Sequence, residues 1–102
     1  MKPPNFWKLE KDAHKRFVGE QLSYARSALG LGQAELGRKY GIAQNKLNQW
    51  EAGLYYPDPR FLAQFSQDYG WTMDYFYRGE MAAVSVARAD DLRRAGAGKV
   101  GA

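Results

Sequence analysis

Glycine residues divide the middle of this sequence into five short segments, and each segment repeats apolar residues at helical spacing. Because glycine readily takes the left-handed backbone conformation that ends a helix, these positions mark helix ends. The predicted helices cover residues 12–29, 33–40, 44–52 and 59–69, followed by a short fifth one capped by Thr72 and ended by Gly79. No segment shows the two-residue alternation of a strand. The sequence therefore predicts an all-α fold, a compact bundle of five short helices.

The length of the chain limits it to one domain. Its 102 residues suffice for one hydrophobic core but not for two, and 45% hydrophobic content with 15% aromatic residues fits a packed globule. We expect the domain over residues 12–79, after an N-terminal basic arm over residues 1–11. Residues 80–102 are expected to form a C-terminal tail that is flexible from residue 96. Between residues 81 and 95 a helix is an open alternative, although the apolar positions form no continuous stripe there.

Several classes of site find no support in the sequence. There is no cysteine, so neither a disulfide nor a thiolate metal site is expected. His14 is the single histidine and has no companion ligands, so we expect it on the surface rather than at a metal or a catalytic centre. No nucleophile–base pair or carboxylate dyad stands in a recognisable context, and we expect neither an enzyme nor a cofactor. No apolar run approaches the ~18 residues of a membrane span, which predicts a soluble protein without membrane contact.

Positive charge is concentrated towards the ends of the chain. The net charge is +4, and residues 1–30 hold six basic against three acidic side chains, whereas residues 31–79 hold five of each. A basic surface favours polyanionic partners, although a charge of this size is mild.

The stretch QAELGRKYGIAQNKLNQW, residues 33 to 50, has the spacing of a helix-turn-helix. Gly37 is expected where the two helices approach closely, and Gly41 where the chain takes a positive φ to reverse direction. The second helix of the pair carries four amide side chains: Gln44, Asn45, Asn48 and Gln49. Gln and Asn pair bidentately with adenine in the major groove and have no charge to desolvate, which indicates a DNA-reading helix.

Over residues 17–79 the chain resembles the phage repressor and Cro family (XRE type) of helix-turn-helix DNA-binding proteins. The resemblance rests on YARSALGLGQAEL, LNQWEAG, PDPRFLAQFSQDYG and TMDYFYRG in this order, around the turn glycine Gly41. It implies a repressor-like transcription regulator that binds a double-stranded DNA operator as a homodimer. It also implies a cytoplasmic, nucleoid-associated protein of a prokaryote or phage.

The resemblance assigns roles to individual residues. Base contacts fall to Gln44, Asn45 and Gln49, with Asn48 beside them. Gln33 is similar to the glutamine that binds phosphate and braces the recognition helix, and Lys39, Lys46 and Arg60 are further candidates for DNA backbone contacts. Arg26 and Glu51 occupy the positions of a buried structural ion pair.

A dimer contact is expected near the last two predicted helices. Trp71, Tyr75 and Tyr77 crowd an end of the domain that is too small to bury them all, and an exposed aromatic patch would suit a symmetric interface.

The sequence departs from this family at the starts of two helices. Gly32 and Ala43 stand where relatives often have Ser or Thr, so both helices lack a good N-cap. The alternative function is a protein-interaction module, or an antitoxin-like partner protein, that kept the helix-turn-helix fold. The neutral middle of the chain and the tyrosine-rich segment YYPDP support it.

Overall fold

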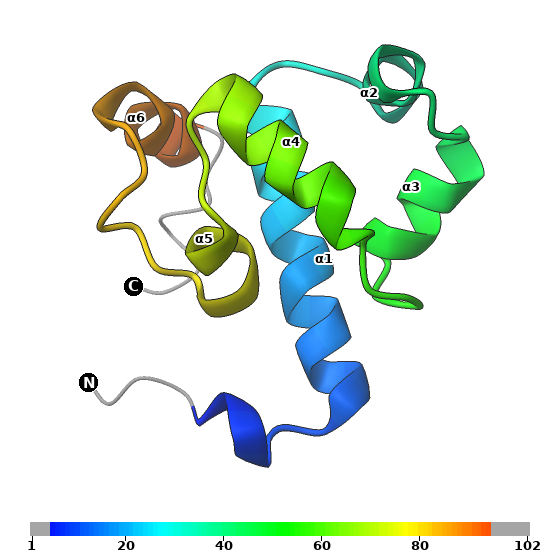
Figure 1. Ribbon diagram of the computed structural model, residues 1–102, viewed down its shortest axis with the longest axis vertical. Helices are drawn as coiled ribbons and strands as arrows, with labels where there is room; N and C mark the ends of the chain where they lie inside the picture. Colours follow the sequence, from blue (N-terminus) through cyan, green and yellow to red (C-terminus); the bar gives the residue numbers. More distant parts are fainter. Residues whose placement is uncertain (1–4, 95–102) are drawn as a thin grey trace.

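The computed structural model describes residues 5–94, and these fold into helices joined by short connections (Figure 1). The elements are a 3₁₀ turn η1 (Phe6–Lys8) and the helices α1 (Lys11–Ala28), α2 (Gln33–Tyr40), α3 (Gln44–Glu51), α4 (Pro59–Tyr69), α5 (Met73–Arg78) and α6 (Val86–Arg94). No strand occurs between residues 5 and 94. The predicted all-α fold is confirmed, with a sixth helix beyond the five.

Local capping explains where α4 and α5 begin. The Asp58 carboxylate accepts a hydrogen bond from the Arg60 backbone N–H at 2.8 Å, and Pro59 fits the first turn of α4 because its ring fixes φ. At α5 the Thr72 hydroxyl accepts from the Tyr75 N–H at 3.0 Å.

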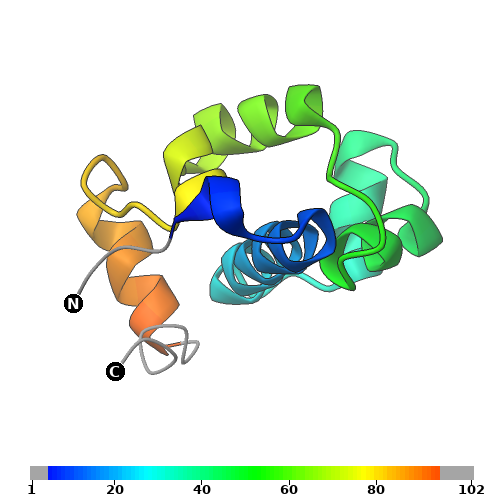
Figure 2. The same ribbon diagram turned by 90° about the horizontal axis from the view of Figure 1, so that it is seen from below.

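Helix α1 is the central element of the fold. It packs against α3, α5 and α6, and in two perpendicular views α2 and α3 lie on one side of it while α5 and α6 lie on the other (Figures 1 and 2). The helix-turn-helix is therefore carried at one side of the domain, away from α5 and α6.

One hydrophobic core joins all six helices. Its largest fully buried side chains include Leu22 of α1, Leu36 of α2, Leu47 of α3, Phe65 of α4 and Phe76 of α5. Val84 and Leu92 belong to the same cluster, at 9% and 4% exposure. The folded unit thus continues beyond Gly79, whereas the expected flexible stretch from residue 96 lies outside the described residues.

The expected aromatic patch at α5 is not exposed. Trp71 and Tyr75 are only 3% and 2% exposed, and the Tyr75 hydroxyl donates to the backbone carbonyl of Gln21 in α1 at 3.0 Å. Tyr77 is partly buried. The prediction did not include the segment after Gly79 in the core, whereas Val84 and Leu92 belong to the same cluster as Trp71 and Tyr75. Trp71 and Tyr75 therefore offer no aromatic surface to a second copy.

The described part of the N-terminal arm lies against α1. The Phe6 ring contacts the rings of His14 and Phe17 at centroid distances of 5.5 and 5.4 Å. The imidazole of His14 is half-buried rather than on the surface, with Nδ1 at 2.8 Å from the Tyr56 hydroxyl and Nε2 at 2.9 Å from the Tyr77 carbonyl. One ring therefore joins α1 to the α3–α4 loop and to the end of α5.

No helix between residues 5 and 94 is long and apolar enough to cross a bilayer.

Candidate nucleic-acid interface

The turn between α2 and α3 depends on two glycines. Gly41 has φ +68°, in the left-handed region that other residues rarely adopt. Gly37 accepts a hydrogen bond from the Ile42 N–H at 2.8 Å, and a Cβ on Gly37 would lie 2.4 Å from the Ile42 carbonyl oxygen. The nearest neighbour of Gly37 is therefore the turn itself, and the Leu47 side chain of α3 follows at 3.6 Å. Both positions keep the connection short, which sets the angle between the two helices.

A third glycine, for which no role was predicted, lets α3 pack closely against α1. A Cβ on Gly19 would lie 2.4 Å from the Trp50 carbonyl oxygen and 2.9 Å from that of Glu51. The backbone at the end of α3 therefore touches α1 directly. A lone glycine beside the apolar stripe of the predicted first helix was the available signal for such a contact.

Arg26 and Glu51 join α1 to the end of α3. Arg26 Nε and Nη2 donate to the two carboxylate oxygens of Glu51, each at 2.8 Å, and the side chains are 16% and 7% exposed. The hydrogen bond to Glu51 raises the pKa of Arg26 above its ordinary value. Arg26 Nη1 also donates to the Leu31 carbonyl at 2.8 Å, which fixes the connection leading into α2.

Gln33 links the start of α2 to the same network. Its amide nitrogen lies 3.2 Å from Glu51 Oε1 and 3.4 Å from Asn48 Oδ1. Arg26, Gln33 and Glu51 therefore fasten α1, α2 and α3 to one another, so that α3 has a fixed position relative to its support. The start of α3 has no such partner, because Ala43 offers no side-chain acceptor.

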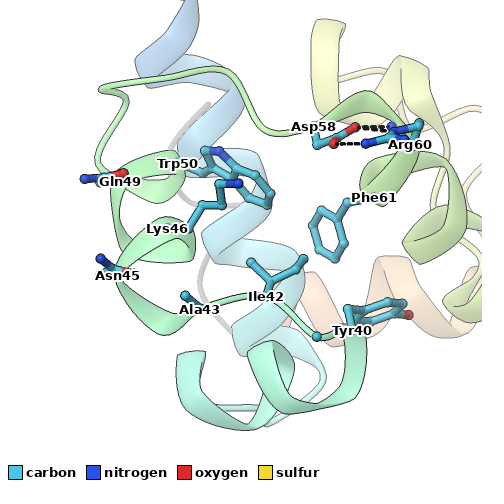
Figure 3. Close-up of a pocket in the computed structure, with 11 residues that line it drawn as sticks. Tyr40, Ile42, Ala43, Asn45, Lys46, Gln49, Trp50, Asp58, Arg60 and Phe61 are labelled. Atoms are coloured by element: carbon cyan, nitrogen blue, oxygen red, sulfur yellow. Dashed lines mark hydrogen bonds and ion pairs between the residues drawn. The ribbon is translucent and has the colours of Figure 1, made fainter.

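The amide side chains of α3 project from this support. Gln44, Asn45 and Asn48 are exposed and Gln49 is half-exposed, while Leu47 and Trp50 face the core. Figure 3 shows Asn45 and Gln49 pointing away from the body of the domain. Within residues 5–94, the Gln44, Asn45 and Gln49 side chains form no hydrogen bond, so their donors and acceptors are available to another molecule.

The candidate backbone-binding cations differ in their surroundings. Lys46 is exposed and forms no ion pair within the described residues. Arg60 is exposed, but its guanidinium lies 3.1 Å from the Asp58 carboxylate, and this contact holds the pKa of Asp58 below its ordinary value. Lys39 lies apart from both, with its ammonium 5.9 Å from the centroid of the Tyr69 ring. Of the three, Arg60 has a charge already balanced by a neighbour.

Lys46 and Arg60 stand at one depression between α3 and the start of α4 (Figure 3). The depression measures about 590 Å³ and has an apolar floor of Ile42, Trp50 and Phe61. No pattern in the sequence indicates this depression, because its walls come from the turn, α3 and α4 together.

Comparison with known proteins identifies a related repressor. No protein-family model matches the chain, and no solved structure matches it with significance. The chain is similar to Repressor protein C2 of Salmonella phage P22, with 28% identity over 72 residues that make up 71% of this chain and 33% of the repressor. The chain thus spans about a third of the length of this relative. The relationship to the phage repressor and Cro type of helix-turn-helix protein, expected from the sequence, is thereby confirmed.

Proposed function

We propose that this protein is a sequence-specific DNA-binding transcription regulator of the repressor type, which places α3 in the major groove. One observation carries the proposal: uncharged amide side chains project from a helix that an ion pair and Gln33 hold in place. Bidentate amide contacts read adenine, and their discrimination depends on a helix that does not move. The similarity to a phage repressor supports the same function.

In this proposal the base contacts come from Gln44, Asn45 and Gln49, with Asn48 next to them. Gln33, Lys39 and Lys46 face the phosphate backbone. Arg60 contributes to backbone contact less than its charge suggests, because Asp58 neutralises it.

Two copies are proposed to act on one operator. A single helix-turn-helix reads few base pairs, and two copies reach useful specificity when their half-sites lie about one helical turn apart. The contact between the copies does not use Trp71 or Tyr75, since both are buried within one chain.

The test is selection of duplex DNA from a random pool, followed by footprinting and titration of the selected sequence. We expect a palindromic footprint and an affinity for it that falls steeply between ~50 and 200 mM salt. Gln44→Ala and Asn45→Ala should lose the preference, while Gln67→Ala, a change of an exposed glutamine on α4, keeps it. Enrichment of no sequence over random DNA would refute the proposal.

The alternative is a protein-interaction module, which the loop after α3 favours. Leu54 and Tyr55 are each 60% exposed there, an apolar pair on the surface next to the recognition helix. Copurification of a stoichiometric protein partner, together with no selected DNA sequence, would favour this function over the first.

A further inference from the structure

The depression beside α3 combines an aromatic floor with cations at its mouth. The Trp50 and Phe61 rings stack at a centroid distance of 5.6 Å, and Tyr40 meets Phe61 edge-on at 5.2 Å. These rings belong to the core or pack against it, and they line the depression together with Ile42. Its volume of about 590 Å³ lies in the range of sites for small molecules, which are typically ~300–1,000 Å³. A planar ring laid on this floor would remove apolar surface from water.

The charged side chains at the mouth of the depression determine which polar group a ligand should carry. Lys46 and Arg60 supply two positive charges, and Asp58 supplies one negative charge. Arg60 is hydrogen-bonded to Asp58, and the charge of Lys46 adds to the lowering of the Asp58 pKa, so that Lys46 lies within electrostatic reach of this pair. Lys46 forms no ion pair of its own within the described residues. One net positive charge therefore remains, which complements a single carboxylate.

The phosphate backbone of DNA fits this depression less well. A phosphodiester strand needs cations and hydrogen-bond donors, but its phosphates and deoxyriboses have no planar ring to lay on a floor of Ile42, Trp50 and Phe61. A molecule that carries a flat ring and one negative charge uses both the floor and the mouth.

We propose that this depression binds a planar aromatic carboxylate, and that such a ligand competes with DNA. Asn45, Lys46 and Gln49 line the depression and also lie on the face proposed to contact DNA. A ligand paired with Lys46 would occupy space next to the amides and withdraw a backbone contact. The competition rests on the proposed function, whereas the binding itself does not.

The three tryptophans provide a test of the binding on the full chain. Only Trp50 lines this depression, while Trp7 lies on η1 and Trp71 is buried in the core near α5. Titration with indole-3-acetate, followed by ¹H–¹⁵N NMR, should move the Trp50 indole N–H signal in a saturable way and leave the signals of Trp7 and Trp71 in place. A Trp50 signal that stays unmoved at millimolar probe, or a response confined to Trp7, would overturn the proposal.

Paired probes and paired variants separate the contribution of the carboxylate to binding from that of the aromatic ring. The uncharged indole-3-acetamide should bind about tenfold more weakly than the acetate, because it loses a charge-assisted contact. Lys46→Gln should weaken the acetate by a similar factor and leave the amide unchanged, while Lys39→Gln, the same change outside the depression, should alter neither. An unchanged backbone NMR spectrum shows that each variant folds. Equal binding of acetate and amide by the parent protein would overturn the assignment of a carboxylate.

The competition is measured with the selected operator DNA. Indole-3-acetate should lower the affinity of the parent protein for this DNA, whereas the Lys46→Gln variant should respond about tenfold less. If the Trp50 signal moves but no DNA sequence is selected, the proposed function fails and the ligand site stands. If DNA binds and the Trp50 signal does not move, the ligand site fails and the proposed function stands. Probe binding that leaves the DNA affinity unchanged would overturn the competition.

Discussion

The ion pair between Arg26 and Glu51 gives the sharpest test of how this fold is held together. Its removal takes away a link between α1 and the end of α3 and an anchor of the connection that leads into α2. In Arg26→Ala, the Glu51 carboxylate keeps one partner, Gln33, although its side chain is only 7% exposed. In Glu51→Ala, the guanidinium keeps only the Leu31 carbonyl. Each variant therefore leaves a charge that has lost most of its hydrogen bonds.

The expected size follows from the exposure of the pair. Breaking a fully buried pair costs ~3–5 kcal/mol, and an exposed pair contributes at most ~1 kcal/mol. Since the side chain of Arg26 is still 16% exposed, water recovers part of the loss, and we expect each single variant to lose about 2–4 kcal/mol. For a domain of this length, that corresponds to a fall in Tm of roughly 10–25 °C.

Urea and thermal unfolding followed by far-UV circular dichroism measure this loss. The double variant Arg26→Met, Glu51→Leu strands no charge and should lose less than the sum of the two single variants. Arg78→Ala is the matched control, because Arg78 and Asp74 are 60% and 64% exposed and 3.8 Å apart, so the change should stay within ~0.5 kcal/mol. If both single variants unfold within ~1 kcal/mol of the parent protein, the argument from burial is refuted.

Three further predictions follow from individual contacts. Gln44→Ala and Asn45→Ala should each cost ~1–3 kcal/mol of base discrimination in DNA titrations and at most ~0.5 kcal/mol of stability; a variant that unfolds would show a structural residue instead. Gly19→Ala should lower stability by ~1–3 kcal/mol despite its better helix propensity, because its Cβ would meet the Trp50 carbonyl, and a stabilised variant in urea unfolding would contradict this. Hydrogen bonds from Tyr40, then Gln64, lower the pKa of Asp68 from its ordinary 3.8. The parent protein should therefore be more stable to unfolding than Asp68→Asn above that pH, and this difference should vanish as acid protonates the folded carboxyl. A stability difference that does not change with pH would exclude this cause.

Local signals were sufficient to predict most of the helices. Helix α4 has the predicted bounds, residues 59–69. Its start is set by Asp58 and Pro59 and its end by Gly70, and all three are adjacent in sequence to the ends that they determine. The helical period also placed Leu47 and Trp50 inward and the amides of α3 outward. Such features depend on neighbours in sequence, which a pattern can report.

Features built from distant segments were not predictable in the same way. Helix α6 has no continuous apolar stripe, yet it packs against α1, which is distant in sequence, and its Leu92 joins the core together with the preceding Val84. Trp71 is buried in the same cluster as these two residues. The contacts of His14 were not predictable, because its partners, Tyr56 and Tyr77, are 42 and 63 residues away along the chain.

In α3 the residues that attach the helix to the domain differ from those that are exposed, and this has a consequence for how such a protein can diversify. Leu47, Trp50 and Glu51 attach the helix to the domain. Gln44 and Asn45 are exposed and take no part in this attachment. Sequence drift at 44 and 45 is therefore nearly free of any penalty in folding, while drift at the three attachment positions is not. A lineage of such proteins would change its targets quickly and its architecture slowly. For protein engineering, a library randomised at 44 and 45 alone should return folded members in most clones, and under the proposed function each would prefer its own DNA sequence.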